Sequence, residues 1–253
     1  MNQVIKWVLL GLVVYLVFLL AKLPASQVIH RIPLPDNIIV SNVEGTIWSG
    51  NAGNVFINNI AIDNVHWEAS FWSLLIGNLS LDIEAGTLRD SSTIFIQGPL
   101  VVDMFNPNHI QTHDLSIYVP AKMAIAQVSL PVYADASGRF RVDIQELDYF
   151  DACRSLTGTG QWINAGLSGL QGLNAPLDLG NFSADLRCDG EQVLVQVKQP
   201  NVFNLTADVR VAHDAKWSID GRFKPADELP EQVKSAAQFF GRTDAQGFYN
   251  IKF

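Results

Sequence analysis

The chain has 253 residues, of which 48% are hydrophobic and only 17% are charged, and its formal net charge is −8. A chain of this length accommodates one large β-rich domain or two smaller ones. No basic patch occurs beyond the N-terminus, so we expect no nucleic-acid partner.

Residues 4–23 form the one strongly apolar run, VIKWVLLGLVVYLVFLLAKL. Only Lys6 and Lys22 interrupt it, both near its ends, and Trp7 lies where an interfacial aromatic anchor would lie. Twenty helical residues at ~1.5 Å each span about 30 Å, which is the thickness of a bilayer core. The run therefore predicts a transmembrane helix. A cleaved signal peptide is the alternative, although its best cleavage site, ending at Ala25, has leucine where a small residue is wanted.

Residues 24–36 carry three prolines, at positions 24, 33 and 35. Proline pushes the residue before it towards extended backbone. We therefore expect residues 24–36 to form an extended linker that leads away from the helix.

From Asn54 onward the hydrophobic pattern has a period of two, because apolar residues alternate with mostly polar neighbours. This period is typical of half-buried antiparallel strands. The alternating sets are Val55 and Ile57; Leu79, Leu81 and Ile83; Leu115, Ile117 and Val119; Phe140, Val142 and Ile144; Val193, Val195 and Val197; Leu205, Ala207, Val209 and Val211; and Trp217 and Ile219.

Helical signals are few. A helix is predicted between Pro230 and Gly241, where apolar residues recur at helical spacing. These residues are Val233, Ala236, Ala237 and Phe240. Shorter helical turns are predicted over 71–76 and 121–127.

Three pairs of segments suggest an internal repeat. GNLSLDI at 77–83 matches GNFSADL at 180–186, and DASGRFRVDI at 135–144 matches DAQGFYNIKF at 244–253. Gly45 and Trp48 in GTIWSG have counterparts in Gly158 and Trp162 in GTGQW. We expect these four residues to mark equivalent turns or bulges, with each tryptophan capping a core.

The repeat predicts two β-rich units, at 37–145 and 146–253, that follow the linker. The predicted fold is mainly β: an N-terminal transmembrane helix, then two similar antiparallel units with few short helices. The units form a long twisted sheet, a half-barrel or a two-sheet sandwich, which the period alone does not distinguish.

Cys153 and Cys188 are the two cysteines, and they lie 35 positions apart. In an exported chain they would form a disulfide, whereas in a cytosolic chain they would be two buried free thiols. The apolar N-terminal run favours export, and we expect the disulfide.

Candidates for chemistry are weak. His109 and His113 have the spacing of two zinc ligands on a helix, but the segment HIQTH lacks the glutamate of that motif. Asp148 and Asp151 are a carboxylate pair of a kind that is usually solvated. No G-x-S-x-G, P-loop or C-x-x-C motif occurs. We predict that the chain has no catalytic, cofactor-binding or metal-binding residues and that it is not an enzyme.

The whole chain resembles the type II secretion system protein N family of Gram-negative bacteria. The residues that carry the resemblance are the apolar N-terminus, GTIWSGNAGNV and VHWEASFWSLLIGNLSLDI in the first half. In the second half they are CRSLTGTGQWINAGL, LGNFSADLRCDG and AAQFFGRTDAQGFYNIKF. Both cysteines fall where the family carries its pair, and the family offers no catalytic residues.

The resemblance implies a single-pass protein of the cell inner membrane, with residues 1–3 in the cytoplasm, the helix in lipid and the β-rich bulk in the periplasm. It would be an accessory component of the machine that exports folded proteins across the outer membrane. Its partners would be other secretion components, in the inner-membrane platform or among the periplasmic connectors. The alternative is an anchored periplasmic protein that binds or bridges lipid, which would need a continuous apolar groove along its sheet.

Overall fold

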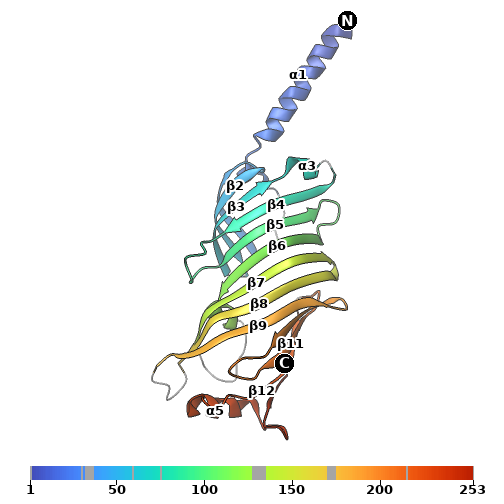
Figure 1. Cartoon of the computed structure of the whole chain (residues 1–253). Coiled ribbons are helices and arrows are strands. Elements are labelled where there is room, and N and C mark those ends of the chain that lie inside the picture. Colours follow the sequence, from blue (N-terminus) through green and yellow to red (C-terminus); the bar gives the residue numbers. More distant parts are fainter. Residues whose placement is uncertain are drawn as a thin grey trace.

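The computed structural model describes residues 2–29, 31, 37–58, 60–74, 76–126, 135–169, 175–214 and 216–252. Its strands form one antiparallel sheet in which the order in space follows the order in the chain (Figure 1). The strands are β1 (Ile38–Gly45), β2 (Ser49–Ile57), β3 (Ile60–Ala69), β4 (Asn78–Ala85), β5 (Phe95–Asp103), β6 (His109–Pro120), β7 (Asp135–Phe150), β8 (Ala152–Ser168), β9 (Leu177–Asp189), β10 (Gln192–Lys198), β11 (Thr206–Val211), β12 (Trp217–Phe223) and β13 (Tyr249–Lys252).

The helices are one long helix and several short ones. Helix α1 (Asn2–Ala21) projects from the end of the molecule that carries β1 to β3 (Figure 1). The short helices are α2 (Ala25–Ile29), α3 (Phe71–Leu74), α4 (Ala121–Ile125) and α5 (Glu231–Ala237), which continues into the 3-10 turn η1 (Gln238–Phe240).

The prediction of a mainly β, antiparallel chain with few short helices is confirmed. Of the predicted arrangements, the structure has the long single sheet and not the two-sheet sandwich. The helix expected between Pro230 and Gly241 is present as α5 and η1. The turns expected over 71–76 and 121–127 correspond to α3 and α4, while residues 75 and 127 lie outside the described residues.

The expectation of an extended linker over 24–36 is wrong for residues 25–29, which form α2. Ala25 is buried, and Pro24 forms an isolated bridge with Thr46. The helix forms here because Pro24 immediately precedes it, where proline's missing N–H costs no helical hydrogen bond. Residues 30 and 32–36 of the expected linker lie outside the described residues.

The expected boundary between two units, at 145 and 146, falls inside β7. Strand β7 pairs along its length with β6 on one side and β8 on the other, so the sheet continues across this position. The division into units 37–145 and 146–253 stays a prediction.

Register gives the sheet one apolar face and one polar face. Ten residues form consecutive cross-strand pairs from β4 to β13, and all ten are apolar or glycine. This apolar column consists of Ala85, Ile96, Ile117, Val142, Gly160, Ala184, Val197, Ala207, Gly221 and Ile251. Side chains of adjacent strand residues point to opposite faces. The neighbouring polar column consists of Gln97, Ser116, Asp143, Thr159, Asp185, Gln196, Asp208, Asp220 and Lys252.

Candidate functional site

His109 and His113, which we predicted not to form a metal site, both lie in strand β6. His109 and His113 are four residues apart on one strand, so their Cα atoms lie about 13 Å from each other. One metal ion cannot bind both at that separation. Among the described residues, no group of three or more histidine, cysteine, aspartate or glutamate side chains could hold a metal ion.

The carboxylates of Asp148 and Asp151 have separate structural partners. Asp148 accepts a hydrogen bond from the Gln111 side chain at 3.1 Å and lies 3.1 Å from His109 Nε2. Asp151 accepts a hydrogen bond from Asn108 Nδ2 at 2.7 Å. These contacts join β6 to β7, and the turn before β6 to the turn after β7, which is a structural use of both carboxylates.

Cys153 and Cys188 form a disulfide with their Cα atoms 5.6 Å apart. Cys153 is buried at the start of β8, and its N–H donates a hydrogen bond to the Glu191 carbonyl oxygen at 3.0 Å. The disulfide joins the start of β8 to the end of β9, which is the open end of this hairpin. There it packs with Leu156 and Leu186 in a buried cluster.

Gly45 and Trp48 lie at the turn between β1 and β2, beside the end of α1. Gly45 has φ +86°, and a Cβ at this position would lie 2.6 Å from the Ser49 carbonyl oxygen, so the turn requires glycine. Trp48 Nε1–H donates a hydrogen bond to the Leu20 carbonyl oxygen at 2.8 Å. Its ring also packs edge-on against Phe71 of α3, at 5.4 Å between centroids.

This contact forms part of a junction between α1 and the sheet, which we define as residues 20–24 and 46–49. The Ile47 N–H donates to the Leu23 carbonyl oxygen at 3.1 Å, and Pro24 pairs with Thr46. The last carbonyls of a helix have no partner within the helix. The turn that carries Trp48 supplies one donor to Leu20 at the end of α1 and another to Leu23 just beyond it, and so fixes where the helix meets the sheet.

Gly158 and Trp162 lie within β8 rather than in a turn. Trp162 Nε1–H donates to the Ser137 carbonyl oxygen at 3.0 Å, and its ring lies 5.3 Å from the rings of both Phe140 and Phe182. The structure therefore does not bring Trp48 and Trp162 together. The two residues occupy different kinds of element, and the proposed equivalence of their segments stays a prediction.

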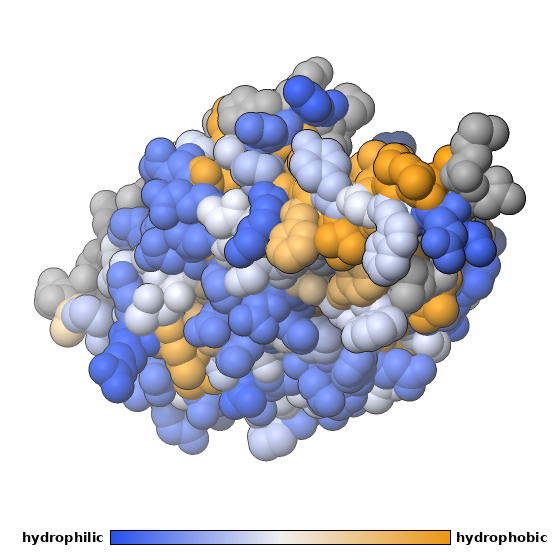
Figure 2. All heavy atoms as spheres, turned by 90° about the horizontal axis from the view of Figure 1, so that it is seen from above, coloured by the Kyte–Doolittle hydropathy of each residue, from blue (hydrophilic) through white to orange (hydrophobic). Residues whose placement is uncertain are grey.

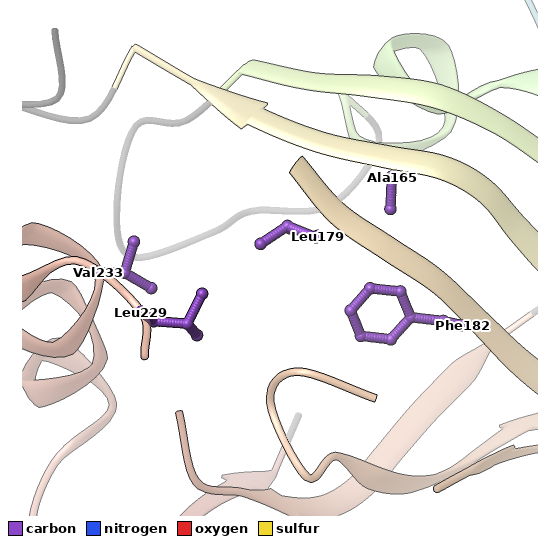
Figure 3. Close-up of a cluster of buried hydrophobic side chains, with 5 residues drawn as sticks. All are labelled: Ala165, Leu179, Phe182, Leu229 and Val233. Atoms are coloured by element: carbon purple, nitrogen blue, oxygen red, sulfur yellow. The ribbon is translucent and has the colours of Figure 1, made fainter. Parts of the chain in front are cut away.

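The apolar face holds a hollow of about 480 Å³ between strands β7–β10 and α5. Its lining is formed chiefly by aromatic and aliphatic side chains, among them Phe140, Trp162, Phe182, Val197, Val233 and Phe240. Figure 3 shows Leu229 and Val233, from α5 and the segment before it, on the opposite side of the cluster from Phe182, with Leu179 between them. A helix thus covers the apolar face at this end of the sheet.

The polar residues beside the hollow direct their side chains elsewhere. The Arg141 guanidinium forms an ion pair with Asp143 at 2.7 Å and lies over the Tyr118 ring, on the face opposite Phe140. Gln161 and Ser183 are paired across β8 and β9 and alternate with the apolar lining residues. The hollow therefore presents hydrocarbon and aromatic surface, with no charged side chain of a described residue directed into it.

Helix α1 is exposed along its length, and residues Gln3–Ala21 are long and apolar enough to cross a membrane. Seen from the end that carries α1, hydrophilic residues cover most of the visible surface, and hydrophobic residues gather mainly in one region of it (Figure 2). Near the junction, the side chains of Trp72 and Ile76 are 75% and 76% exposed.

The sequence predicted the cysteine pair but not the junction or the hollow. For the hollow a signal was present: the small lining residues Gly160 and Ala184 both occur in the apolar phase of their strands. Their alignment in one column could be seen only once the register was known.

The model of the family "Type II secretion system (T2SS), protein N" matches residues 36–252 of the chain. A protein of that name from Aeromonas hydrophila is 28% identical over 258 residues, covering 100% of this chain and 98% of its own length. Its namesake from Vibrio cholerae is 27% identical, covering 98% and 97%, and the one from Klebsiella pneumoniae is 23% identical, covering 92% and 88%. No solved structure matches the chain.

Proposed function

Because the chain belongs to the family of type II secretion system protein N, we propose that it is an accessory inner-membrane component of that system which acts through protein–protein contacts. Its β-rich part would lie in the periplasm, tethered by α1. There it would support the export of folded periplasmic proteins across the outer membrane. Its partners would be components of the inner-membrane platform or the periplasmic connectors.

Tethering by α1 is supported by its length and by the junction. Twenty residues of helix at ~1.5 Å each span the roughly 30 Å of a bilayer core. Tryptophan is enriched at membrane interfaces, and Trp48 and Trp72 both lie at the end of the sheet that α1 enters. With α1 in the bilayer, these two residues would lie at the headgroup level and the sheet would extend away from the membrane.

The observation that carries the contact proposal is the open end of the sheet farthest from α1. We define this far edge as Trp217–Ile219 of β12 together with β13. Strand β13 pairs only with residues 220–223 of β12, so within the described part of the chain no strand pairs with the outer side of the far edge. Trp217 is 46% exposed beside these unpaired backbone groups.

An unpaired edge is a template for an added strand, because its N–H and C=O groups can pair with an extended segment of another protein. Exposed tryptophan is the residue type that most often anchors such contacts. The partner is thus expected to supply an extended segment with an apolar side chain that packs on Trp217. No enzymatic step is part of this function.

The proposal is tested by replacing Trp217 with a photo-crosslinking amino acid in secreting cells. The same replacement at Thr159, an exposed residue of the polar column far from either edge, is the matched control. We expect an adduct with another secretion component from position 217 in the membrane fraction, and none from position 159. Recovery of no secretion component from position 217, or equal recovery from both positions, would contradict contact through the far edge.

A further inference from the structure

The hollow on the apolar face has a size and lining that suit a hydrocarbon chain. We propose that it binds one acyl chain of a membrane phospholipid, which lies across strands β7–β10 beneath α5. Of the far edge, Ile251 of β13 lines the hollow, whereas Trp217 does not. The choice of a phospholipid as the source of the chain rests on the proposed tethering of the protein in a membrane.

Backbone pairing disfavours an extended peptide as the occupant. Each of the strands β7–β10 has a hydrogen-bonded neighbour on both sides, so its N–H and C=O groups are already used in the sheet. An extended peptide backbone in the hollow would lose its hydrogen bonds to water and gain none, which is costly. An acyl chain has no polar groups to satisfy, and its transfer from water into the hollow is favourable.

The dimensions of the hollow fit a chain of this kind. Its volume of about 480 Å³ is within the roughly 300–1,000 Å³ typical of small-molecule pockets. Strands β7 to β10 are three spacings of ~4.8 Å apart, or about 14 Å along the sheet. One acyl chain spans half of a ~30 Å bilayer core, or about 15 Å. A single chain can therefore lie in the hollow across several strands.

Small residues form the floor of the site, and aromatic residues form its wall. Gly160 and Ala184 are directly paired in the apolar column, beside the ring ladder of Phe140, Trp162 and Phe182. Larger residues at the two floor positions would fill the space that the chain needs. A Cβ built on Gly160 would lie 3.3 Å from the nearest atom, the Cδ1 of the flexible Leu186 side chain, so a side chain fits there without a backbone clash.

The apolar column continues from the hollow towards the end of the sheet that carries α1. Beyond β7 it runs through Ile117 and Ile96 to Ala85, which packs in a buried cluster with Ile62 of β3. Apolar side chains thus continue from the hollow to strands beside the junction, where Ala85 and Ile62 are buried. A bilayer at that end is the nearest source of acyl chains, which favours a phospholipid over a soluble fatty acid.

The test uses the full chain in nanodiscs of phosphatidylethanolamine and phosphatidylglycerol. A tracer phospholipid carries a photoactivatable diazirine in its acyl chain, and the labelled peptides are mapped by mass spectrometry. We expect label on β7–β10 of the wild-type chain, in addition to label on α1. Gly160→Leu fills the floor and should lower the labelling of these strands roughly tenfold, equivalent to about 1.4 kcal/mol of binding free energy.

Thr159→Leu adds the same side chain one residue away, on the polar face, and should leave the labelling unchanged. If Gly160→Leu fails to form the Cys153–Cys188 disulfide, Ala184→Leu replaces it as the floor variant. Label confined to α1 in the wild-type chain would overturn the proposal without any variant. So would labelling of β7–β10 by diazirine palmitate but not by the phospholipid, or equal labelling in the floor variant. Crosslinking from position 217 does not depend on the hollow, so the two proposals can fail separately.

Discussion

The disulfide allows a quantitative prediction. It closes a loop of 35 residues, and the entropy lost by the unfolded chain on closing such a loop corresponds to about 4 kcal/mol at 25 °C. Replacing both cysteines with alanine, as Cys153→Ala/Cys188→Ala, should therefore lower the free energy of unfolding by about 4 kcal/mol. Alanine is chosen because Cys153 is buried, and a serine hydroxyl there would need a hydrogen-bond partner.

The assay is urea unfolding of the full chain in detergent, followed by far-UV circular dichroism. With a urea dependence of about 2–3 kcal/mol per molar, the midpoint should fall by roughly 1.3–2 M. Reductant should move the wild-type midpoint by a similar amount and leave that of the double variant unchanged. A midpoint shift below about 0.5 M in both comparisons would refute the reasoning. It would mean that the chain between the cysteines is already confined in the unfolded state.

Two further predictions concern the junction and the glycines. Trp48→Phe removes the hydrogen bond to the Leu20 carbonyl, which is worth about 1 kcal/mol, so the rate of amide hydrogen exchange in the junction should rise roughly fivefold. The control variant Trp72→Phe, at a 75% exposed residue, should leave this rate unchanged. Equal effects of the two variants would contradict the role of the bond. Gly180→Ala should lower the free energy of unfolding by about 1–2 kcal/mol, because φ is +72° with open space around it. Gly86→Ala should lower the free energy of unfolding by more than Gly180→Ala does, because φ is +73° and the new Cβ would collide with a backbone carbonyl. Equal losses for the two variants in urea unfolding would refute the steric argument.

The strands were predictable because their signal is local. Leu115, Ile117 and Val119 alternate with polar residues in the sequence, and all three lie in β6. The choice between one sheet and a sandwich was not predictable from the same signal. An apolar strand face has the same period whether a second sheet or a helix such as α5 covers it.

The tryptophans show where local reasoning reached its limit. Trp48 and Trp162 share a glycine–threonine context, yet one bonds to the end of α1 and the other stacks between neighbouring strands. Their partners lie 20 or more residues away in the sequence, so the flanking residues cannot identify them. Gly77 and Gly180 both have positive φ, at +84° and +72°, but Gly77 immediately precedes β4 and Gly180 lies within β9, so the repeat stays a prediction.

The strictly sequential strand order determines how far the protein reaches. Each new strand is added beside the previous one, so the thirteen strands formed by the described residues set twelve spacings of ~4.8 Å, or about 58 Å measured along the curved sheet. Lengthening a strand would widen the sheet without moving its far end. Inserting or removing one hairpin would move the far edge by about 10 Å relative to α1. The number of hairpins thus determines the distance between the end of α1 and any partner that binds at the last strand.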